Sequence, residues 1–225
     1  MAAVSLPVRA VGGDYHDVIC VDGHRFALCV ADVSGKGLSA ALLMANVQAV
    51  VRSLVLSAPP VETLAGRTNA LVCRNTGGEH FVTLFFGVLD TAEHRFRYVN
   101  AGHNPPILLR KGRPALELTE GGLILGVLED AVYEPGAVDL EPGDLLVMFS
   151  DGVTEAWGEG GAEYGTTRLL ETVAACLEGN DTAAGIRDCI LRSVRRHAGP
   201  KGPGDDLTLL VLRRLPPEPK GVECE

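Results

Sequence analysis

The sequence predicts an α+β fold in which antiparallel sheets are covered by pairs of helices. Three observations favour this class: short apolar runs occur in neighbouring groups, helical runs occur two at a time, and no repeat or long linker divides the chain. A chain of 225 residues buries about 70% of its unfolded surface, so it can form one core without a disulfide or a metal.

Seven short apolar runs bounded by turn residues predict strands. They are 18–21, 26–33, 82–89, 96–101, 106–109, 144–150 and 207–212. Four longer runs predict helices in two pairs. They are 38–57, 61–74, 166–177 and 181–198, the last capped by Asn180 or Asp181. We expect a single domain over residues 1–214 and a disordered C-terminal tail over 215–225, which is rich in proline.

The helix predicted over 38–57 is apolar nearly all round. The simplest interpretation is a helix of the core, buried on most sides. The alternative is a movable element whose outer face meets an activator protein or a second copy of the chain. Asn46, Gln48 and Arg52 interrupt the run, so we expect no membrane span.

Composition and charge exclude several classes of protein. Hydrophobic residues make up 46% of the chain and charged residues 22%, which is not typical of a disordered or fibrous protein. The net charge is −9 and no basic block occurs, so nucleic acid and anionic membranes are not expected partners. The six cysteines form no CxxC pair and the N-terminus does not resemble a signal peptide, so we expect buried thiols in a reducing cytoplasm.

Aspartates occur at the ends of four predicted strands. Asp14 and Asp32 flank the first hairpin: a three-residue turn sets them directly across from each other, whereas a two-residue turn puts them on opposite faces. Asp151 ends a buried strand, and Asp205 with Asp206 opens the last one. Such carboxylates repel one another unless a cation neutralises them, and Mg²⁺ and Mn²⁺ prefer carboxylate oxygens. The alternative, that each aspartate caps a turn and meets solvent, stays open.

Five local strings occur in a fixed order along nearly the whole chain. They are Gly12-Gly13-Asp14-Tyr15-His16-Asp17, Asp32-Val33-Ser34-Gly35-Lys36-Gly37, Ala101-Gly102-His103-Asn104-Pro105-Pro106, Pro142-Gly143-Asp144 leading to Ser150-Asp151-Gly152-Val153-Thr154-Glu155-Ala156, and Gly204-Asp205-Asp206-Leu207-Thr208. Together they resemble the PPM-type (type 2C-like) metal-dependent serine/threonine phosphatases. The resemblance is to the bacterial branch typified by the sporulation stage II E phosphatase and the stress-response sigma regulators.

The resemblance implies a four-layer α-β-β-α sandwich with two Mn²⁺ or Mg²⁺ ions in a cleft at one edge of the sheets. By motif, Asp14 and Asp32 would hold the metals with help from the Val33 carbonyl, and Asp151 and Asp205 would complete the set. Asp206 occupies a position where the family has Asn or Asp. A hydroxide that bridges the two metals would attack phosphorus in line, and serine or threonine would leave.

The same resemblance implies a phosphoserine or phosphothreonine substrate on a regulatory protein, an anti-sigma-factor antagonist in this branch. The alternative is a non-catalytic module of the same fold that regulates a partner by docking; the presence of all four metal-site aspartates favours catalysis. Ser34 stands where eukaryotic relatives carry a histidine, so the leaving-group acid stays unassigned. Lys36 follows Asp32 closely and is a candidate to attract the phosphorylated substrate. His103 is expected to be structural rather than catalytic, since its proline-rich corner needs polar partners.

Overall fold

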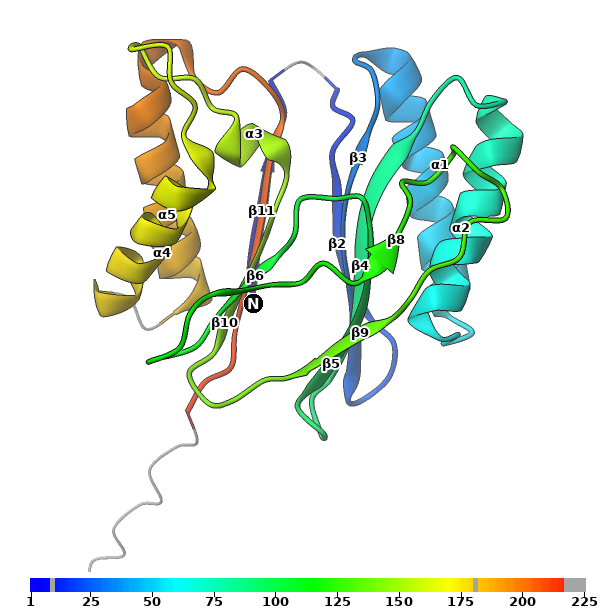
Figure 1. Cartoon of the computed structure of the whole chain (residues 1–225), viewed down its shortest axis with the longest axis horizontal. Helices are drawn as coiled ribbons and strands as arrows, with labels where there is room; N and C mark the ends of the chain where they lie inside the picture. The colour runs from blue at the N-terminus through cyan, green and yellow to red at the C-terminus, as the bar shows by residue number, and fades with distance from the viewer. Residues whose placement is uncertain (9–10, 180–181, 217–225) are drawn as a thin grey trace, which may run out of the picture.

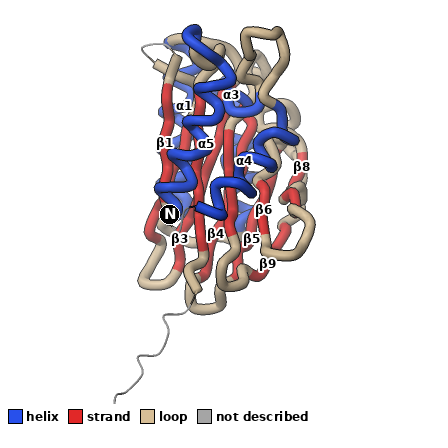
Figure 2. The backbone as a smooth tube through the Cα atoms, turned by 90° about the vertical axis from the view of Figure 1, so that its left-hand side faces the viewer, coloured by secondary structure: helices blue, strands red, loops and turns tan. Residues whose placement is uncertain are grey.

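Two β-sheets pack face to face, and a pair of helices covers the outer face of each (Figure 1). The computed structural model describes residues 1–8, 11–179 and 182–216. Turned by 90°, the backbone shows the helices α4 and α5 lying in front of the strands (Figure 2). The four-layer α-β-β-α arrangement and the pairing of the helices confirm the predicted fold class.

The first sheet has the strand order β2-β3-β4-β5-β8, with β9 also paired to β5. Its strands are β2 (Tyr15–Cys20), β3 (Arg25–Val33), β4 (Val82–Asp90), β5 (Arg95–Ala101), β8 (Gly121–Gly122) and β9 (Gly136–Asp139). All pairs are antiparallel except the short pair of β5 with β8. Helices α1 (Leu38–Val55) and α2 (Val61–Thr76) cover this sheet, because prolines 59 and 60 end α1 and let the chain reverse.

The second sheet has the strand order β1-β11-β10-β6-β7. Its strands are β1 (Ala2–Leu6), β11 (Leu207–Arg213), β10 (Leu145–Phe149), β6 (Ile107–Leu109) and β7 (Leu116–Glu117). The short helix α3 (Asp151–Thr154) follows β10, a 3-10 turn covers Gly199–Lys201, and α4 (Gly165–Gly179) and α5 (Ala183–Ala198) cover the sheet. The N-cap of α5 is Thr182, whose side chain accepts from Gly185 N at 3.1 Å, so the predicted caps are wrong. The predicted cap residues themselves, Asn180 and Asp181, lie outside the described residues.

Three apolar layers hold the sandwich together. One lies between α1, α2 and the first sheet, one between α4, α5 and the second sheet, and one between the sheets. The inter-sheet layer contains stacked rings of Phe85, Phe96 and Tyr98 with centroids 5.4–6.1 Å apart. These rings fix the spacing of the two sheets, since close-packed interiors deform little.

Helix α1 is less buried than the simplest interpretation of its sequence predicts. Only Ala40, Val47, Val51 and Val55 are buried, on the side that packs against the sheet and α2. Leu38 and Leu42 are 68% and 63% exposed. Among the described helices, only α1 is long and apolar enough to cross a membrane. This is weak evidence for a membrane span, because core helices of proteins without one meet the same test.

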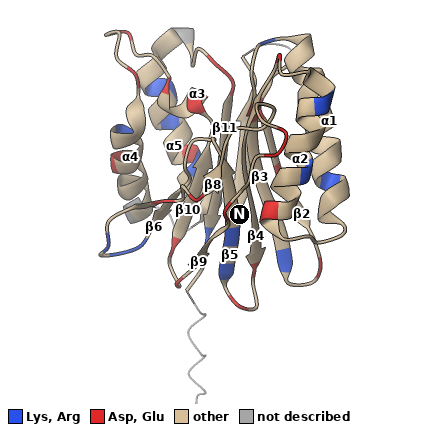
Figure 3. Ribbon diagram, turned by 45° about the vertical axis from the view of Figure 1, so that its right-hand side comes forward, with Lys and Arg blue, Asp and Glu red and all other residues tan. Residues whose placement is uncertain are grey.

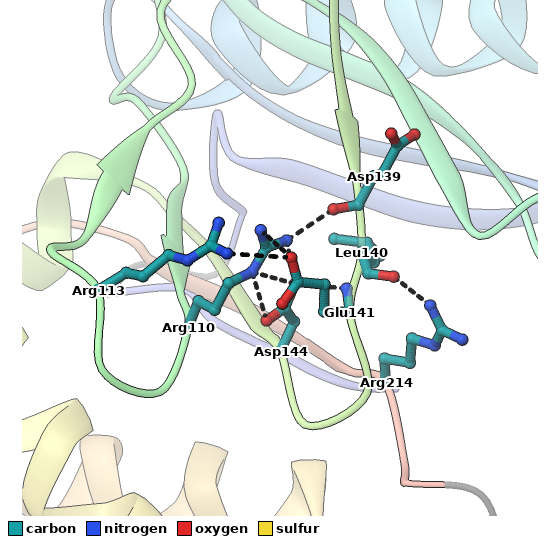
Figure 4. Close-up of polar contacts among 7 residues, drawn as sticks. All are labelled: Arg110, Arg113, Asp139, Leu140, Glu141, Asp144 and Arg214. Atoms are coloured by element: carbon teal, nitrogen blue, oxygen red, sulfur yellow. Dashed lines mark hydrogen bonds and ion pairs between the residues drawn. The ribbon is translucent and has the colours of Figure 1, made fainter.

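A buried ion pair fixes the lower end of the second sheet (Figure 4). Asp144 is 2% exposed and accepts from Arg110 Nε at 3.0 Å and Nη2 at 2.7 Å. Arg110 also reaches the Glu141 carboxylate and the Asp139 carbonyl, both at 2.7 Å. This network satisfies the turn before β10, and it explains the Pro142-Gly143-Asp144 string as a structural motif.

The expectation that the cysteines are thiols is wrong at one pair. Cys176 on α4 and Cys189 on α5 form a disulfide. Cys20, Cys29 and Cys73 are free. Cys224 lies outside the described residues, as does the predicted tail over 215–225 apart from residues 215 and 216.

Candidate active site

The four aspartates predicted to hold metals come from both sheets and meet at one end of the sandwich. Asp14 directly precedes β2, and Asp32 is the last residue but one of β3. Asp151 begins α3, with Ser150 alone between it and β10, and Asp205 stands two residues before β11. The acidic start of α3 is visible at this upper end in Figure 3. The strand ends thus bring together residues that are nearly two hundred positions apart in the sequence.

The register of the first hairpin decides how Asp14 and Asp32 are related. Tyr15 pairs with Ala31 and Cys20 with Phe26, which is the register of the three-residue turn. Continued by one position, it sets Asp14 across from Asp32 and on the same face of the sheet. The two-residue turn, which would have separated them, is excluded.

A cavity of about 380 Å³ opens between these strand ends. Asp32, Asp151 and Asp205 line it, together with Lys36 and the glycines before Asp14. Asp14 lies deeper, and its Oδ2 atom is buried without a hydrogen-bond partner among the described residues. An orphaned carboxylate oxygen next to three further carboxylates is the arrangement that a bound cation would stabilise.

Burial and mutual repulsion perturb the carboxyl groups. Burial raises the pKa of Asp14 to about 7; hydrogen bonding from the Thr208 and Ser150 side chains opposes this rise, and the charges of Asp206 and Asp151 add to it. Burial also raises the pKa of Asp32 to about 7, with further increments from Asp14, Asp151 and Asp205. The pKa of Asp151 is raised too, first by burial and then by the charge of Asp205. Each shift arises first from burial and then from the neighbouring carboxylates, and a bound cation would relieve both effects by favouring the ionised groups.

One cation already lies at the edge of the cavity. The Lys36 ammonium is 2.6 Å from Asp205 Oδ2, and both side chains are about half exposed. Lys36 thus faces the aspartates, at the place from which it could meet an incoming phosphate.

Glycines allow the backbone to approach the acidic residues closely. A Cβ atom on Gly12 would lie 2.2 Å from Asp206 Oδ2, and one on Gly152 would lie 2.0 Å from the Asp206 carbonyl oxygen. A Cβ atom on Gly13 would lie 3.0 Å from the Val33 carbonyl oxygen, which therefore faces the glycine loop. Glycine at positions 12, 13 and 152 therefore allows these segments to lie against Asp206 and Val33 without a steric clash.

Asp206 has a different task from Asp205. Its Oδ1 accepts from Val8 N at 2.8 Å and its Oδ2 from Gly13 N at 3.0 Å. Both carboxylate oxygens of Asp206 therefore hold the loop between β1 and β2 in place. The sequence alone does not distinguish this role from that of the adjacent Asp205.

The donor set fits hard divalent cations, because it consists of carboxylates and a backbone carbonyl. Among the residues that the structure describes, no group of three or more His, Cys, Asp or Glu side chains is already gathered as a metal cluster. The site is therefore an open set of donors that a metal would draw together.

The sequence motifs gave Ser34 no role of its own and missed Thr83. Ser34 Oγ accepts from Phe81 N at 2.9 Å, which makes it a structural residue of the loop after β3. Thr83 pairs with Asp32 across the strands, lines the cavity and contacts His103 Nδ1 at 2.8 Å. His103 is 4% exposed, and burial lowers its pKa to about 4, so it is neutral. This agrees with a structural role for His103.

Comparisons with known proteins converge on one group. The family model described as stage II sporulation protein E matches residues 22–215. The phosphoserine phosphatase RsbU of Bacillus subtilis is 32% identical over 218 residues, which cover 95% of this chain and 63% of that protein. The RsbU and RsbW domains of Rv1364c from Mycobacterium tuberculosis have a TM-score of 0.80 at 25% identity, covering 97% of this chain and 62% of that one.

A further solved structure, RsbX in complex with magnesium, has a TM-score of 0.70 at 17% identity and covers 94% of this chain and 92% of that one. This likeness concerns the fold alone. The chain spans less than two thirds of the length of the curated relatives it matches.

Proposed function

Because the chain belongs to the stage II sporulation protein E family, we propose that it is a metal-dependent protein serine/threonine phosphatase. The observation that carries the proposal is the cavity lined by Asp32, Asp151 and Asp205, behind which the orphaned Asp14 oxygen is buried. Relatives named phosphoserine phosphatase support the reaction class.

In the proposed reaction, Asp14, Asp32, Asp151 and Asp205 hold two Mn²⁺ or Mg²⁺ ions, with the Val33 carbonyl as a further ligand. When bound, the ions neutralise phosphoryl oxygens and acidify water for attack on phosphorus. The chain's own residues fix the geometry: Asp206 anchors the glycine loop, and Thr83 supports Asp32 from the neighbouring strand.

The decisive test is hydrolysis of p-nitrophenyl phosphate and of a phosphoserine peptide with Mn²⁺ or Mg²⁺. We expect Asp32→Asn to lose activity while keeping the fold, and Asp139→Asn, whose side chain is 73% exposed at the opposite end of the sheet, to keep both. A folded wild-type chain that shows no turnover with either metal would favour the non-catalytic docking module instead.

We propose that the natural substrate is a phosphoserine or phosphothreonine on an anti-sigma-factor antagonist. Support comes from the similarity to RsbU and from a relative structure that holds RsbU and RsbW domains in one protein. A phosphorylated antagonist should be dephosphorylated faster than a peptide carrying the same phosphoserine, and an Asp151→Asn variant should retain it during purification. Equal rates for protein and peptide would contradict this substrate class.

We assign Lys36 to recognition of the substrate phosphate. Its ammonium already faces the carboxylates of the cavity, 2.6 Å from Asp205. Lys36→Met should raise KM for the phosphopeptide at least tenfold. An unchanged KM would remove Lys36 from the substrate site.

We propose that the outer side of α1 docks an activator protein or a second copy of the chain. Leu38, Leu42, Ala45 and Ala49 are exposed at helical spacing and form an apolar stripe. Light scattering of the wild type and of Leu42→Glu, each without added protein, distinguishes the occupants. If α1 docks a second copy, the wild type is a dimer and Leu42→Glu is a monomer. If α1 docks an activator protein, both are monomers. The proposed location is the cytoplasm.

A further inference from the structure

A second cavity lies at the opposite end of the first sheet from the acidic one. It has a volume of about 330 Å³ and is enclosed by the α1–α2 connection and the lower ends of β3, β4 and β5. Along β3, Arg25 at this cavity is seven positions from Asp32, which at about 3.3 Å per residue is about 23 Å. The two cavities are therefore separate, and this one has the size of a small-molecule site, for which about 300 Å³ is the lower limit.

The walls of this cavity are apolar and deeply buried. Val55, Val61, Leu64 and Phe86 line it and are at most 5% exposed in the folded chain. Prolines 59 and 60 form part of the rim and stiffen it. A rigid apolar hollow of this kind gains free energy when an apolar group replaces the water inside it.

Arginine side chains supply the polar groups of the same cavity. Arg25 is engaged by Asp22 at 2.7 Å. Arg95 reaches Asp139 only at 3.5 Å, and its Nε atom is buried without a partner. Arg97 is exposed, and no hydrogen bond or ion pair joins its guanidinium to any described residue. Figure 3 shows basic positions at the lower end of β5, away from α3.

Neither acidic residue of the rim, Asp90 or Glu93, forms an ion pair with these arginines. Asp90 Oδ1 accepts from Ala92 N at 2.9 Å and from Glu93 N at 3.0 Å, so it closes the β4–β5 turn. Glu93 is exposed. Three arginines and two carboxylates line the cavity, and Asp22 and Asp139 pair with Arg25 and Arg95 from outside it. The site therefore carries no surplus of positive charge, but Arg95 and Arg97 retain unused donors, which favour a ligand with acceptor oxygens over a cation.

We propose that this cavity binds a small organic anion with an apolar body of ring size, of the class of arylalkyl carboxylates. The body fills the hollow against Phe86 and Leu64. The carboxylate meets the guanidinium groups of Arg95 and Arg97 at the mouth. Because Arg95 Nε is buried, the exposed ends of the two guanidinium groups receive the carboxylate, and each planar group presents paired donors to it.

The test is titration of the full chain, with Mg²⁺ present, with 3-phenylpropionate and with its neutral analogue 3-phenyl-1-propanol. Binding is followed by calorimetry and by amide chemical shifts in NMR spectra. We expect shifts concentrated in residues 55–64 and 86–97, and at least tenfold weaker binding of the alcohol. Equal affinity for acid and alcohol, or shifts centred on the acidic cavity, would overturn the proposal.

Variants separate the two halves of the site. Arg97→Gln should weaken binding of the acid at least tenfold, whereas Arg192→Gln, which changes an exposed arginine on α5, should leave it unchanged. Val88→Phe should block the hollow from its β4 side while the unfolding temperature shows that the fold is kept. If Val88→Phe does not fold, Arg97→Gln decides alone, and unchanged binding by that variant contradicts the assignment.

Discussion

The ion pair between Arg110 and Asp144 should be one of the strongest single contributions to stability outside the apolar layers. Replacing Asp144 by Leu removes the carboxylate that accepts from Nε and Nη2 of Arg110 and from Glu141 N at 2.7 Å. The guanidinium then stays largely buried, since the Arg110 side chain is only 18% exposed. Breaking such a pair costs about 3–5 kcal/mol.

The lower end of that range applies here, because Arg110 keeps the Glu141 carboxylate and the Asp139 carbonyl as partners (Figure 4). We therefore expect a loss of about 3 kcal/mol. For a chain of this length that corresponds to a fall in Tm of about 6–12 °C. Thermal unfolding followed by circular dichroism measures it, and high salt should change the loss little, because the pair is buried.

Two further variants test the reasoning. Glu141→Gln changes a half-exposed partner of the same arginine and should cost less than about 1 kcal/mol. The double variant of Arg110→Met with Asp144→Leu should be more stable than Asp144→Leu alone, because no buried charge is left unpaired. A loss for Asp144→Leu no larger than that for Glu141→Gln, or a double variant less stable than Asp144→Leu, would contradict this role of the ion pair.

Three other outcomes follow from the structure. Gly152→Ala places a Cβ atom 2.0 Å from the Asp206 carbonyl oxygen, and the resulting displacement should lower kcat about 100-fold, measured with p-nitrophenyl phosphate; near-normal turnover would refute the close approach. Without metal, in EDTA, the raised pKa of Asp32 means that near pH 6 the folded chain binds a proton that the unfolded chain does not. The free energy of unfolding of the wild type, relative to that of Asp32→Asn, should therefore rise as pH falls from 8 to 6. Urea unfolding at both pH values checks the sign. Reducing the Cys176–Cys189 disulfide should cost about 2–3 kcal/mol, seen as a lower urea midpoint in dithiothreitol, and an unchanged midpoint would exclude that contribution.

Local patterns in the sequence carry much of the fold and the placement of the site. The turn at Asp22-Gly23-His24 allows the register that sets Asp14 across from Asp32, and the strand ends at Asp151 and Asp205 follow from apolar runs that stop at glycine or proline. Such features depend on neighbours within a few residues, so that the sequence displays them directly.

The features that were missed depend on contacts between distant segments. Strand β1 forms because Ala2 to Leu6 meets β11 from the other end of the chain. The task of Asp206 depends on Val8 N and Gly13 N, which the sequence places almost two hundred positions away. The disulfide depends on which faces of α4 and α5 meet, and apolar periodicity leaves that pairing undetermined.

The proposed metal site is divided between the two sheets of the sandwich. Asp14 and Asp32 belong to the sheet that carries α1 and α2, while Asp151 and Asp205 belong to the other, and the rings of Phe85, Phe96 and Tyr98 separate them. A shift of one sheet along the other would increase the distance between the aspartate pair of the first sheet and that of the second. Metal affinity would then depend on the relative position of the two sheets. A partner that binds the outer helices and shifts one sheet would thereby change metal binding and, with it, phosphate hydrolysis.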